Sequence, residues 1–472
     1  MTHRPATVAA LLLVALLSAL EATVVTTAMP TVVADLGGIE WYGWVGASYL
    51  LASTLAVPLF GKLSDVLGRK RVLYFGVATF LAGSLAAGFA PGLLALVVAR
   101  TVQGLGAGAM QPTTLTIVGD LFSLGERGKV QAAFGTVWGA SGALGPLLGG
   151  WIVSQWSWPW VFWVNLPFGL AAVAVLQVAY RESFEPRRAQ IDWLGAALLT
   201  VASIALLLGA EGTAPALTLP LGVAAAVGFV GAEWRAASPI LPIPLLVRPV
   251  VAAAAGSSLV LGAAMAGVSL FVPLWAQGVL GADPTAAGSA LALMLIGWPV
   301  AAGVSSRMVM RVGFRPSVWV GAAFVAAALA TLAGATTYGS LWGVRAAMLL
   351  FGSGMGLTVN AQLLAVQVGA AHHERGVATS TGLFARSMGS ALGAGGLGAV
   401  LAAGLGDAVP AERVSALLDP RGAVASPEAT AALDGALGPI WAVLVGLALI
   451  NVVVVAFYPR SPPVVAAGAD PR

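Results

Sequence analysis

Long apolar runs, separated by short polar stretches, recur along the whole chain. Each run is about 20 residues long, which is enough for one helix to cross the ~30 Å hydrocarbon core of a bilayer. The pattern therefore predicts fourteen membrane-spanning helices. They are expected at residues 8–29, 44–62, 72–90, 93–118, 130–152, 161–180, 193–211, 216–234, 250–275, 286–308, 317–336, 340–365, 377–403 and 437–458.

The composition of the 472 residues also indicates a membrane protein. Only 9% of them are charged and 59% are hydrophobic, whereas about a quarter of the residues of a soluble domain are charged. The 60 glycines and 27 prolines sit inside the apolar runs, where glycine permits close helix packing and proline can break a helix. The first run is too long for a cleaved signal peptide, so we expect a retained first span.

The basic residues set the expected orientation. If both termini are cytoplasmic, 18 of the 23 lysines and arginines fall in cytoplasmic segments, and only Arg413 and Arg421 fall outside. Positive residues favour cytoplasmic loops, so we expect a protein of the bacterial cytoplasmic (inner) membrane with both termini in the cytoplasm. The net charge of +4 reflects this topology, and no nucleic acid partner is expected.

A repeat of 248 residues relates the two ends of the chain. Glu126-Arg127-Gly128 opens the fifth span and Glu374-Arg375-Gly376 opens the thirteenth. Arg100 and Arg345 each precede a run of alternating glycines, although the second run is shifted by about a turn. Chance similarity of glycine-rich helices is the alternative. We predict two related six-helix bundles, typical of secondary transporters, as domains 1–190 and 249–472, with spans seven and eight inserted as 191–248.

Charged residues inside spans are functional candidates, because burying one costs at least ~2.5 kcal/mol. Glu21 is the only acid well inside the first span, ~20 Å along the helix from its cytoplasmic end. It is suited to carry a proton; the alternative is a neutral glutamate that serves packing. Arg100 cannot lose its charge, so it must pair with an acid or carbonyls, or face water. It either tunes Glu21 or fixes helix packing.

Charges also gather near the cytoplasmic ends of spans. Asp120 ends the fourth span, while Asp65 and Arg71 are expected in the loop after the second. They suggest an ion-pair network that closes an inner gate in one state and opens in another. The alternative is a set of solvated loop charges, which contribute little.

These motifs resemble those of the major facilitator superfamily, and within it the fourteen-span drug:proton antiporters. Residues 61–71, Gly-Lys-Leu-Ser-Asp-Val-Leu-Gly-Arg-Lys-Arg, match the superfamily's loop between spans two and three. The resemblance implies an all-α major facilitator fold and a cytoplasmic gate or charge relay. The residues that it assigns to this relay are Gly61, Asp65, Gly68, Arg69, Arg71 and Asp120.

Two further motifs imply proton coupling and export. Arg100-Thr101-Val102-Gln103-Gly104 resembles the fourth-span motif that the family associates with proton coupling, so the resemblance gives this role to Glu21 and Arg100. A glycine-rich stretch of the fifth span looks like the motif typical of antiporters, and its proline can bend the helix. Its residues are Gly142, Gly145, Pro146, Gly149 and Gly150.

Other motifs are similar with departures. Trp156-Ser157-Trp158 and the stretch Asn165 to Gly169 resemble an external element of the fourteen-span group, and Arg386 with Gly389 and Gly393 resembles its thirteenth span. Glu21 replaces the aspartate usual in the first span, which keeps a carboxylate but moves it outward. The tenth span has no acid, which argues against divalent organic cations.

We expect a proton-coupled antiporter that exports small lipophilic compounds by alternating access. The proton gradient would drive it without a cofactor, and its partners would be the bilayer, protons and a small-molecule substrate, with the chain acting as a monomer. Candidate cavity residues are Gln103, Met110, Trp138 and Arg386. Export of one endogenous metabolite or lipid-like compound, and uncoupled facilitation, remain alternatives. The chain has no cysteine and only three histidines, which are His3 near the N-terminus and His372 and His373 in a loop beside Glu374. Neither an enzyme nor a metal site is therefore expected.

Overall fold

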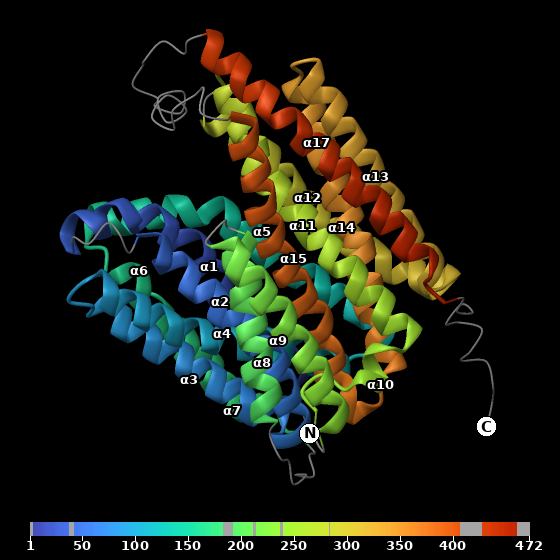
Figure 1. The fold of residues 1–472 in the computed structure, drawn as a ribbon. Helices are drawn as coiled ribbons and strands as arrows, with labels where there is room; N and C mark the ends of the chain where they lie inside the picture. The colour runs from blue at the N-terminus through green and yellow to red at the C-terminus, as the bar shows by residue number, and fades with distance from the viewer. Residues whose placement is uncertain are drawn as a thin grey trace. The chain divides into compact units, whose positions relative to one another are not determined.

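The computed structural model describes residues 3–36, 42–182, 192–210, 214–236, 239–282, 284–405 and 427–459, in which every regular element is helical (Figure 1). The side chains of a few helical residues, including Pro146, lie outside this description. The helices are α1 (Arg4–Leu36), α2 (Tyr42–Leu67), α3 (Arg69–Gly88), α4 (Leu93–Leu121), α5 (Leu124–Gln155), α6 (Trp160–Trp163), α7 (Asn165–Ala179), α8 (Trp193–Ala210), α9 (Pro215–Arg235), α10 (Ile243–Leu246), α11 (Pro249–Gly278), α12 (Pro284–Val312), α13 (Phe314–Thr337), α14 (Leu341–Gly369), the 3₁₀ turn η2 (His372–Glu374), α15 (Arg375–Leu405) and α17 (Pro427–Ala456).

Every predicted span coincides with a long helix, the sixth being formed by α6 and α7 together. Among the described residues, thirteen stretches are long and apolar enough to cross a membrane. The remaining long helix, α5, has 32 residues, and its charged first turns and the many glycines that follow them lower its mean hydropathy. The prediction of an all-α membrane protein with fourteen spans is confirmed.

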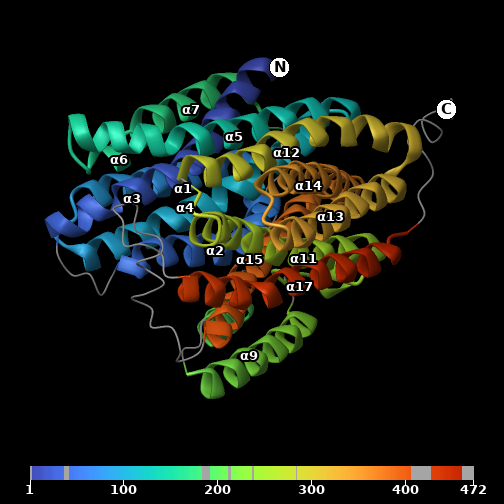
Figure 2. The same cartoon turned by 90° about the horizontal axis from the view of Figure 1, so that it is seen from above.

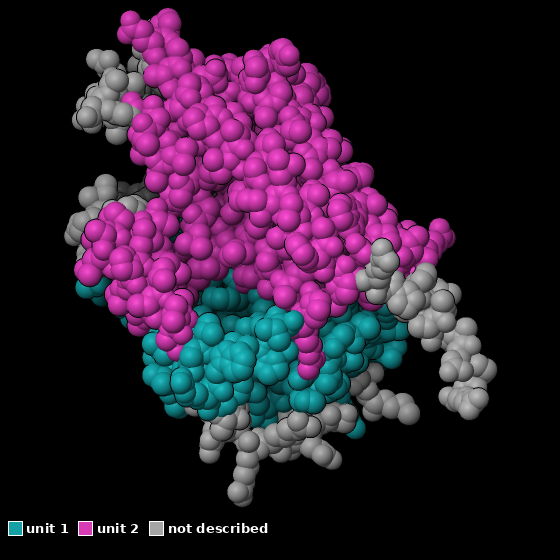
Figure 3. Space-filling view, turned by 45° about the vertical axis from the view of Figure 1, so that its right-hand side comes forward, with its two compact units in different colours: residues 1–200, 229–247, 364–384 teal, residues 201–228, 248–363, 385–472 magenta. Residues whose placement is uncertain are grey.

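The chain divides into two compact units, which Figure 3 colours separately. Unit 1 comprises residues 1–200, 229–247 and 364–384, and unit 2 comprises residues 201–228, 248–363 and 385–472. The inserted helices α8 and α9 contribute residues to both units. The division into three domains expected from the sequence stays a prediction.

Within each unit, neighbouring helices pack through a small set of partners. In unit 1, α4 packs against α2 and α3, and α1 packs against α5 and α7. In unit 2, α17 packs against α11 and α13, and Figures 1 and 2 both show α13 and α17 side by side. Large apolar side chains fill the interior of each unit. They include Leu11, Phe80 and Met110 in unit 1 and Trp275, Phe351 and Trp441 in unit 2.

Two glycine ladders confirm the repeat and correct its register. Gly104 and Gly108 of α4 face the backbone of α2, whereas Gly106 faces the backbone of α3. Their counterparts 248 residues on behave alike, since Gly352 and Gly356 face α12 and Gly354 faces α13. The ladders are therefore in register, without the expected shift of a turn. The residue out of register is Arg345, because Met348 occupies the position equivalent to Arg100.

In both Glu-Arg-Gly segments, the arginine caps the end of the preceding long helix. Arg127 donates from Nε to the carbonyl of Phe122, at 3.0 Å, and from Nη2 to the carbonyl of Gly119. Arg375 donates from Nε to the carbonyl of Gln367, at 3.2 Å. Each arginine thus binds the carbonyl eight residues before it, at the end of the preceding long helix. Cations stabilise such helix C-termini, whose last carbonyls lack partners within the helix.

The connection between α2 and α3 is shorter than the sequence predicts. Asp65 lies in the last turn of α2 and Arg71 in the first turn of α3, so Gly68 alone separates the helices. Gly68 has φ +97°, which a residue with a Cβ rarely adopts. Gly313 repeats this junction between α12 and α13 with φ +89°. The expected loop is therefore a single glycine, and the charges around it are held on rigid helices.

Candidate functional site

A polar cluster surrounds Glu21 inside unit 1. Glu21 of α1 is buried and accepts hydrogen bonds from three side chains. Gln103 Nε2 lies 2.7 Å and Asn165 Nδ2 lies 2.9 Å from Glu21 Oε2, while Arg100 Nη1 bonds Oε1. Ser84 Oγ also accepts from Gln103 Nε2, at 2.8 Å. We refer to Glu21, Ser84, Arg100, Gln103 and Asn165 as the Glu21 cluster.

Arg100 is enclosed by partners on every side. Besides Glu21, it donates to Gln103 Oε1 at 2.7 Å and to the carbonyl of Val45 at 3.2 Å. Its guanidinium carbon lies 4.3 Å from the centroid of the Tyr49 ring, close enough for a cation–π interaction. A buried ion pair persists only when its remaining polar atoms are also bonded. The structure brings together the two residues that the sequence proposed for proton coupling.

Four helices supply the Glu21 cluster, and a fifth, α2, supplies the Tyr49 ring beside Arg100. Glu21 comes from α1, Tyr49 from α2, Ser84 from α3, Arg100 and Gln103 from α4, and Asn165 from the start of α7. Sequence reasoning missed the roles of Ser84 and Tyr49 and quoted Asn165 only as part of a motif. Ser84 and Tyr49 stand in apolar runs without any distinctive spacing. Only the packing of α2, α3 and α4 places them near Glu21.

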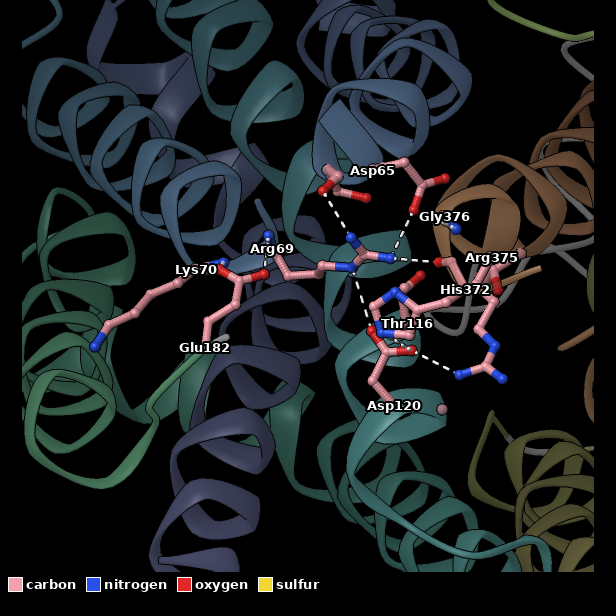
Figure 4. Close-up of polar contacts among 12 residues, drawn as sticks. Asp65, Arg69, Lys70, Thr116, Asp120, Glu182, His372, Arg375 and Gly376 are labelled. Carbon is pink, nitrogen blue, oxygen red and sulfur yellow. Dashed lines mark hydrogen bonds and ion pairs between the residues drawn. The ribbon is translucent and has the colours of Figure 1, made fainter. Parts of the chain in front are cut away.

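The charges at the α2–α3 junction form a second cluster, drawn in Figure 4. Asp65 accepts from Arg69 Nη2 at 2.9 Å and from the backbone N–H groups of Gly376 and Val377 at 3.0 and 2.9 Å. Its carboxylate thus caps the N-terminus of α15, where the helix dipole favours negative charge. We refer to Asp65, Arg69, Asp120 and Arg375 as the Asp65 cluster.

Arg69 and Arg375 neutralise the two acids of the Asp65 cluster. Arg69 Nε lies 3.2 Å from Asp120 Oδ2, and Arg375 Nη1 lies 2.9 Å from Asp120 Oδ1. Arg69 Nη2 also donates to the carbonyl of His372 at 2.7 Å. The side chains of Asp65 and Arg69 are each 2% exposed, so this is a buried pair and not a set of solvated charges. Removing one partner of a buried ion pair lowers the stability of the protein far more than removing one partner of a surface pair.

The sequence assigned both Arg69 and Arg71 to this network, but only Arg69 forms ion pairs in it. The Arg71 side chain is exposed, and it forms no ion pair or hydrogen bond with a described residue. The reason is helical geometry, because Arg71 lies about 200° around α3 from Arg69. Arg375 and His372 were not predicted for this site. They reach Asp120 only because η2 and the start of α15 lie beside the end of α4.

Glu182 is a further acid that sequence reasoning missed. It follows α7 and accepts from the backbone N–H groups of Arg69 and Lys70, at 2.7 and 3.0 Å. Lys70 Nζ in turn donates to the carbonyl of Tyr180 at 2.7 Å. Glu182 caps α3 as Asp65 caps α15, so Arg69 is fixed at its backbone and at its side chain. No spacing in the sequence relates Glu182 to residue 69.

Of the remaining glycines proposed for the site, Gly61 lies at a close helix contact, whereas a Cβ on Gly150 would meet nothing within 4 Å. A Cβ on Gly61 would meet the side chain of Ser380 and the carbonyl of Gly376, so a larger residue would separate α2 from α15. In α5, Gly145 and Gly149 are buried, Gly142 is half-buried and Gly150 is exposed. Pro146 belongs to the same stretch, but its side chain lies outside the described part of the structure.

The four candidate cavity residues are not gathered in one place. Gln103 belongs to the Glu21 cluster, Met110 is fully buried in the apolar core of unit 1, and Trp138 is 39% exposed on α5. Arg386 is half-buried in unit 2. A cavity of about 480 Å³ in unit 2 is lined by other residues. They are Leu270, Phe271, Leu274 and Gln277 of α11 and Ala394 and Gly398 of α15.

His372, His373 and Glu374 form the turn η2. Within the described residues, no group of three or more histidine, aspartate or glutamate side chains is arranged to hold a metal ion. His372 Nε2 lies 3.4 Å from Asp120 Oδ1, so this histidine faces the Asp65 cluster.

Comparison with known proteins places these features in context. Residues 11–394 match the sequence profile of the Major Facilitator Superfamily. The chain is 32% identical over 415 residues to the multidrug transporter protein MdtP of Bacillus subtilis, covering 86% of this chain and 77% of that protein. It is 34% identical over 392 residues to multidrug resistance protein 3 of the same organism, covering 81% and 77%.

A solved structure shares the fold. The proton:xylose symporter XylE bound to a bromo-deoxyglucose superposes with a TM-score of 0.66, covering 98% of this chain and 97% of that one at 13% sequence identity. The similarity extends over almost the whole of both chains. At this identity it indicates a common arrangement of helices and carries no information about substrate.

Proposed function

Because the chain belongs to the major facilitator superfamily, whose members are membrane transporters and not enzymes, we propose that it is a proton-coupled antiporter. It exports small lipophilic compounds across the bacterial cytoplasmic membrane by alternating access, with both termini in the cytoplasm. The multidrug transporters among its relatives support this substrate class. The glycine-rich stretch of α5, typical of antiporters, supports export. No cofactor is needed, since the proton gradient supplies the driving force, and the chain works as a monomer.

The observation that supports coupling most strongly is the arrangement around Glu21. The three side chains that contact its carboxylate are all hydrogen-bond donors, so the cluster is built to hold the ionised form. Protonation turns one oxygen into a donor and removes the charge that balances Arg100. The cluster then has to rearrange. A proton on Glu21 thereby changes the contacts among α1, α4 and α7, which links proton binding to a change of helix packing.

The Asp65 cluster serves as the cytoplasmic gate in this proposal. Two acids and two arginines balance one another, and Asp65 holds the first turn of α15 through two backbone N–H groups. Opening this gate requires the release of the α15 cap and of the Arg375–Asp120 pair. Several charge-assisted bonds must break together, so the closed arrangement is well defined and the transition is cooperative.

Proton release on ligand binding tests the coupling. Wild-type protein in weakly buffered nanodiscs is titrated with a varied panel of lipophilic compounds while a pH indicator is monitored. We expect proton release from wild type with at least one ligand. We expect no release from Glu21→Gln, because its amide does not gain or lose a proton in this pH range. Asp35→Asn is the matched control, because Asp35 is an exposed acid on the same helix. It accepts a bond from Trp158 Nε1 at 2.7 Å, which asparagine can also accept, and this variant should release as many protons as wild type.

Two results would overturn the coupling. One is that no ligand releases protons from wild type, and the other is that Glu21→Gln releases as many as wild type. Substrate transport that ignores the pH gradient and persists in Glu21→Gln would instead indicate an uncoupled facilitator.

A further inference from the structure

Arg386 is a charged residue of unit 2 that neither the Glu21 cluster nor the Asp65 cluster uses. It lies within α15, about 17 Å along the helix axis from Arg375, and its side chain is half-buried. An ionisable residue at such depth in a membrane span usually has a function, because its charge is costly there. An arginine cannot lower this cost by losing its proton.

The Arg386 side chain forms no hydrogen bond, ion pair or ring contact with any described residue. The other two arginines within spans do have partners. Arg100 has those of the Glu21 cluster, and Arg345 donates to Ser289 Oγ at 3.1 Å and lies 4.6 Å from the centroid of the Trp342 ring. Arg386 therefore differs from Arg345 of the same unit in having a charge that no described group satisfies.

No acid of unit 2 lies at the depth of Arg386 in the described residues. The only acids there are Glu428 and Asp434, both near the start of α17. Gly404 of α15 packs against Ala436 of α17, so these acids lie beside the far end of α15. That end is about 27 Å from Arg386 along the helix. A counter-ion from unit 2 itself would have to bridge a distance that no side chain spans.

The backbone around Arg386 is held firmly. A Cβ on Gly262 of α11 would collide with the carbonyl of Arg386, and a Cβ on Gly389 would collide with the backbone of Leu259. The helices α11 and α15 are thus in direct backbone contact at Arg386 and about one turn after it. Arg386 is presented from a rigid position, which favours specific recognition over a mobile surface contact.

An apolar space lies further along the same two helices. The cavity of about 480 Å³ between α11 and α15 contains one polar lining residue, Gln277, among six. It is an open groove, because Leu270 on its wall is 50% exposed, and its volume is within the range of small-molecule sites. Ala394, which lines it, follows Arg386 by about 12 Å along the helix. A charged point and an apolar space at this separation fit the two ends of one amphiphilic molecule.

We propose that unit 2 recognises lipophilic molecules that carry one acidic group, such as a carboxylate. The guanidinium of Arg386 pairs with the acidic group, a match that arginine makes with two parallel hydrogen bonds. The cavity between α11 and α15 receives part of the apolar body. This inference rests on the proposed export function and narrows its substrates to lipophilic acids and zwitterions.

Equilibrium binding of a matched probe pair tests it. The probes are a dansyl-labelled undecanoic acid and its methyl ester, which differ in the charge and by one methyl group. Binding is followed by dansyl fluorescence with protein in phosphatidylcholine nanodiscs, after subtraction of the signal from empty nanodiscs. We expect wild type to bind the acid at least about tenfold more tightly than the ester, as for other hydrogen bonds to charged groups.

Variants locate this preference. Arg386→Gln should bind the acid as weakly as the ester, with the ester affinity unchanged. Arg386→Lys should keep part of the preference, because it keeps the charge but loses the bidentate geometry. Arg345→Gln is the control, since its side chain already has partners, and it should keep the full preference. An acid preference that persists in Arg386→Gln, or that wild type lacks, overturns the proposal.

Two further arms separate this proposal from others. In Glu21→Gln the acid preference should remain even where ligand-induced proton release is lost, because equilibrium binding at Arg386 needs no proton transfer. Loss of proton release would thus indicate a failure of coupling, whereas loss of the acid preference would indicate a failure of the Arg386 site. Adding phosphatidylglycerol to the nanodiscs should leave the preference intact. If the anionic lipid abolishes it, Arg386 binds lipid headgroups and the proposal is wrong.

Discussion

At the scale of single residues, the same side chain acquires different roles from its neighbours. Arg100 and Arg386 both lie within spans, yet Arg100 is bound by Glu21, Gln103 and a carbonyl, whereas Arg386 has no described partner. Arg69 and Arg71 are two positions apart, yet only Arg69 reaches Asp65. A buried charge must be neutralised, so the surroundings of each arginine show whether its charge is neutralised by groups of the described structure.

The buried pair of Asp65 and Arg69 gives a prediction at this scale. Asp65→Asn leaves Arg69 with one acid fewer and turns an amide donor toward the N–H groups of Gly376 or Val377. We expect the variant to lose about 3 kcal/mol of stability, as when one partner of a buried pair is removed. The change is measured as a fall in the melting temperature of the purified protein.

A double-mutant cycle supplies the control. The double variant Asp65→Asn/Arg69→Gln should lose less stability than the two single variants lose together, because each single change already breaks the pair. Arg71→Gln should change stability by no more than about 0.5 kcal/mol, as expected for an exposed side chain. If Arg71→Gln is as damaging as Asp65→Asn, the assignment of the pair to Arg69 is incorrect.

At the scale of helices, glycine decides which surfaces can touch. Apolar area gives little drive for helix association inside a bilayer, so close backbone approach and polar contacts do more of this work. Gly104, Gly106 and Gly108 let α4 approach α2 and α3, and the second ladder lets α14 approach α12 and α13 in the same way. The helix contacts of the first bundle are thus repeated in the second, although few side chains are shared.

The glycine contacts yield a prediction at this scale. Gly106→Leu and Gly354→Leu place a side chain against the backbone of α3 and α13 respectively. Overpacking of this kind costs at least about 1–3 kcal/mol, and backbone atoms cannot move aside as side chains do. We expect a large loss of monodisperse protein in size-exclusion chromatography for both variants.

Gly46→Leu on α2 is the matched control, because a Cβ there meets nothing within 4 Å. It should yield nearly as much folded protein as wild type. If all three variants behave alike, hydrophobicity or helix propensity explains the loss and close backbone contact does not.

At the scale of the whole molecule, the two halves of the repeat have diverged in chemistry. Gln103 and Arg100 of the Glu21 cluster correspond under the repeat to Phe351 and Met348, which are fully buried in the apolar core of unit 2. Unit 1 therefore holds the described buried acid–base chemistry, and unit 2 holds an arginine and an apolar cavity. This difference is consistent with the two proposals made above, in which unit 1 binds the proton and unit 2 binds the substrate.

The orientation of the chain gives a prediction at this scale, and the absence of cysteine makes it simple to test. Ser157→Cys lies between α5 and α6, and Lys129→Cys lies on an exposed position near the start of α5. From the distribution of basic residues, we expect a membrane-impermeant thiol reagent to label Ser157→Cys in intact cells and Lys129→Cys only after permeabilisation. The reverse pattern would place the termini outside. The cysteine-free wild type reports the background.

Much of the fold follows from the sequence alone, because each apolar run is matched to the thickness of the bilayer. A helix that crosses lipid must satisfy its backbone internally, so length and hydropathy mark thirteen of the spans among the described residues without knowledge of their neighbours. The repeat is visible in the sequence because both halves need glycine at the same close helix contacts. Glu21 and Arg100 stand out because charge is rare in such runs.

The tertiary structure decides what these residues touch. Glu182 caps α3 and Arg375 pairs with Asp120, although each lies more than a hundred residues from its partner and has no distinctive spacing. The sequence placed Asp65 in a loop and gave Arg71 a part in the network, because a run of charged residues is typical of a loop. In the structure these residues lie on helices, and Arg69 and Arg71 lie on different sides of α3. The sequence by itself determined which segments cross the membrane and which charges are costly there. Only the packing of the helices determined which of those charges are neutralised, since neutralisation depends on distances between groups remote in the chain.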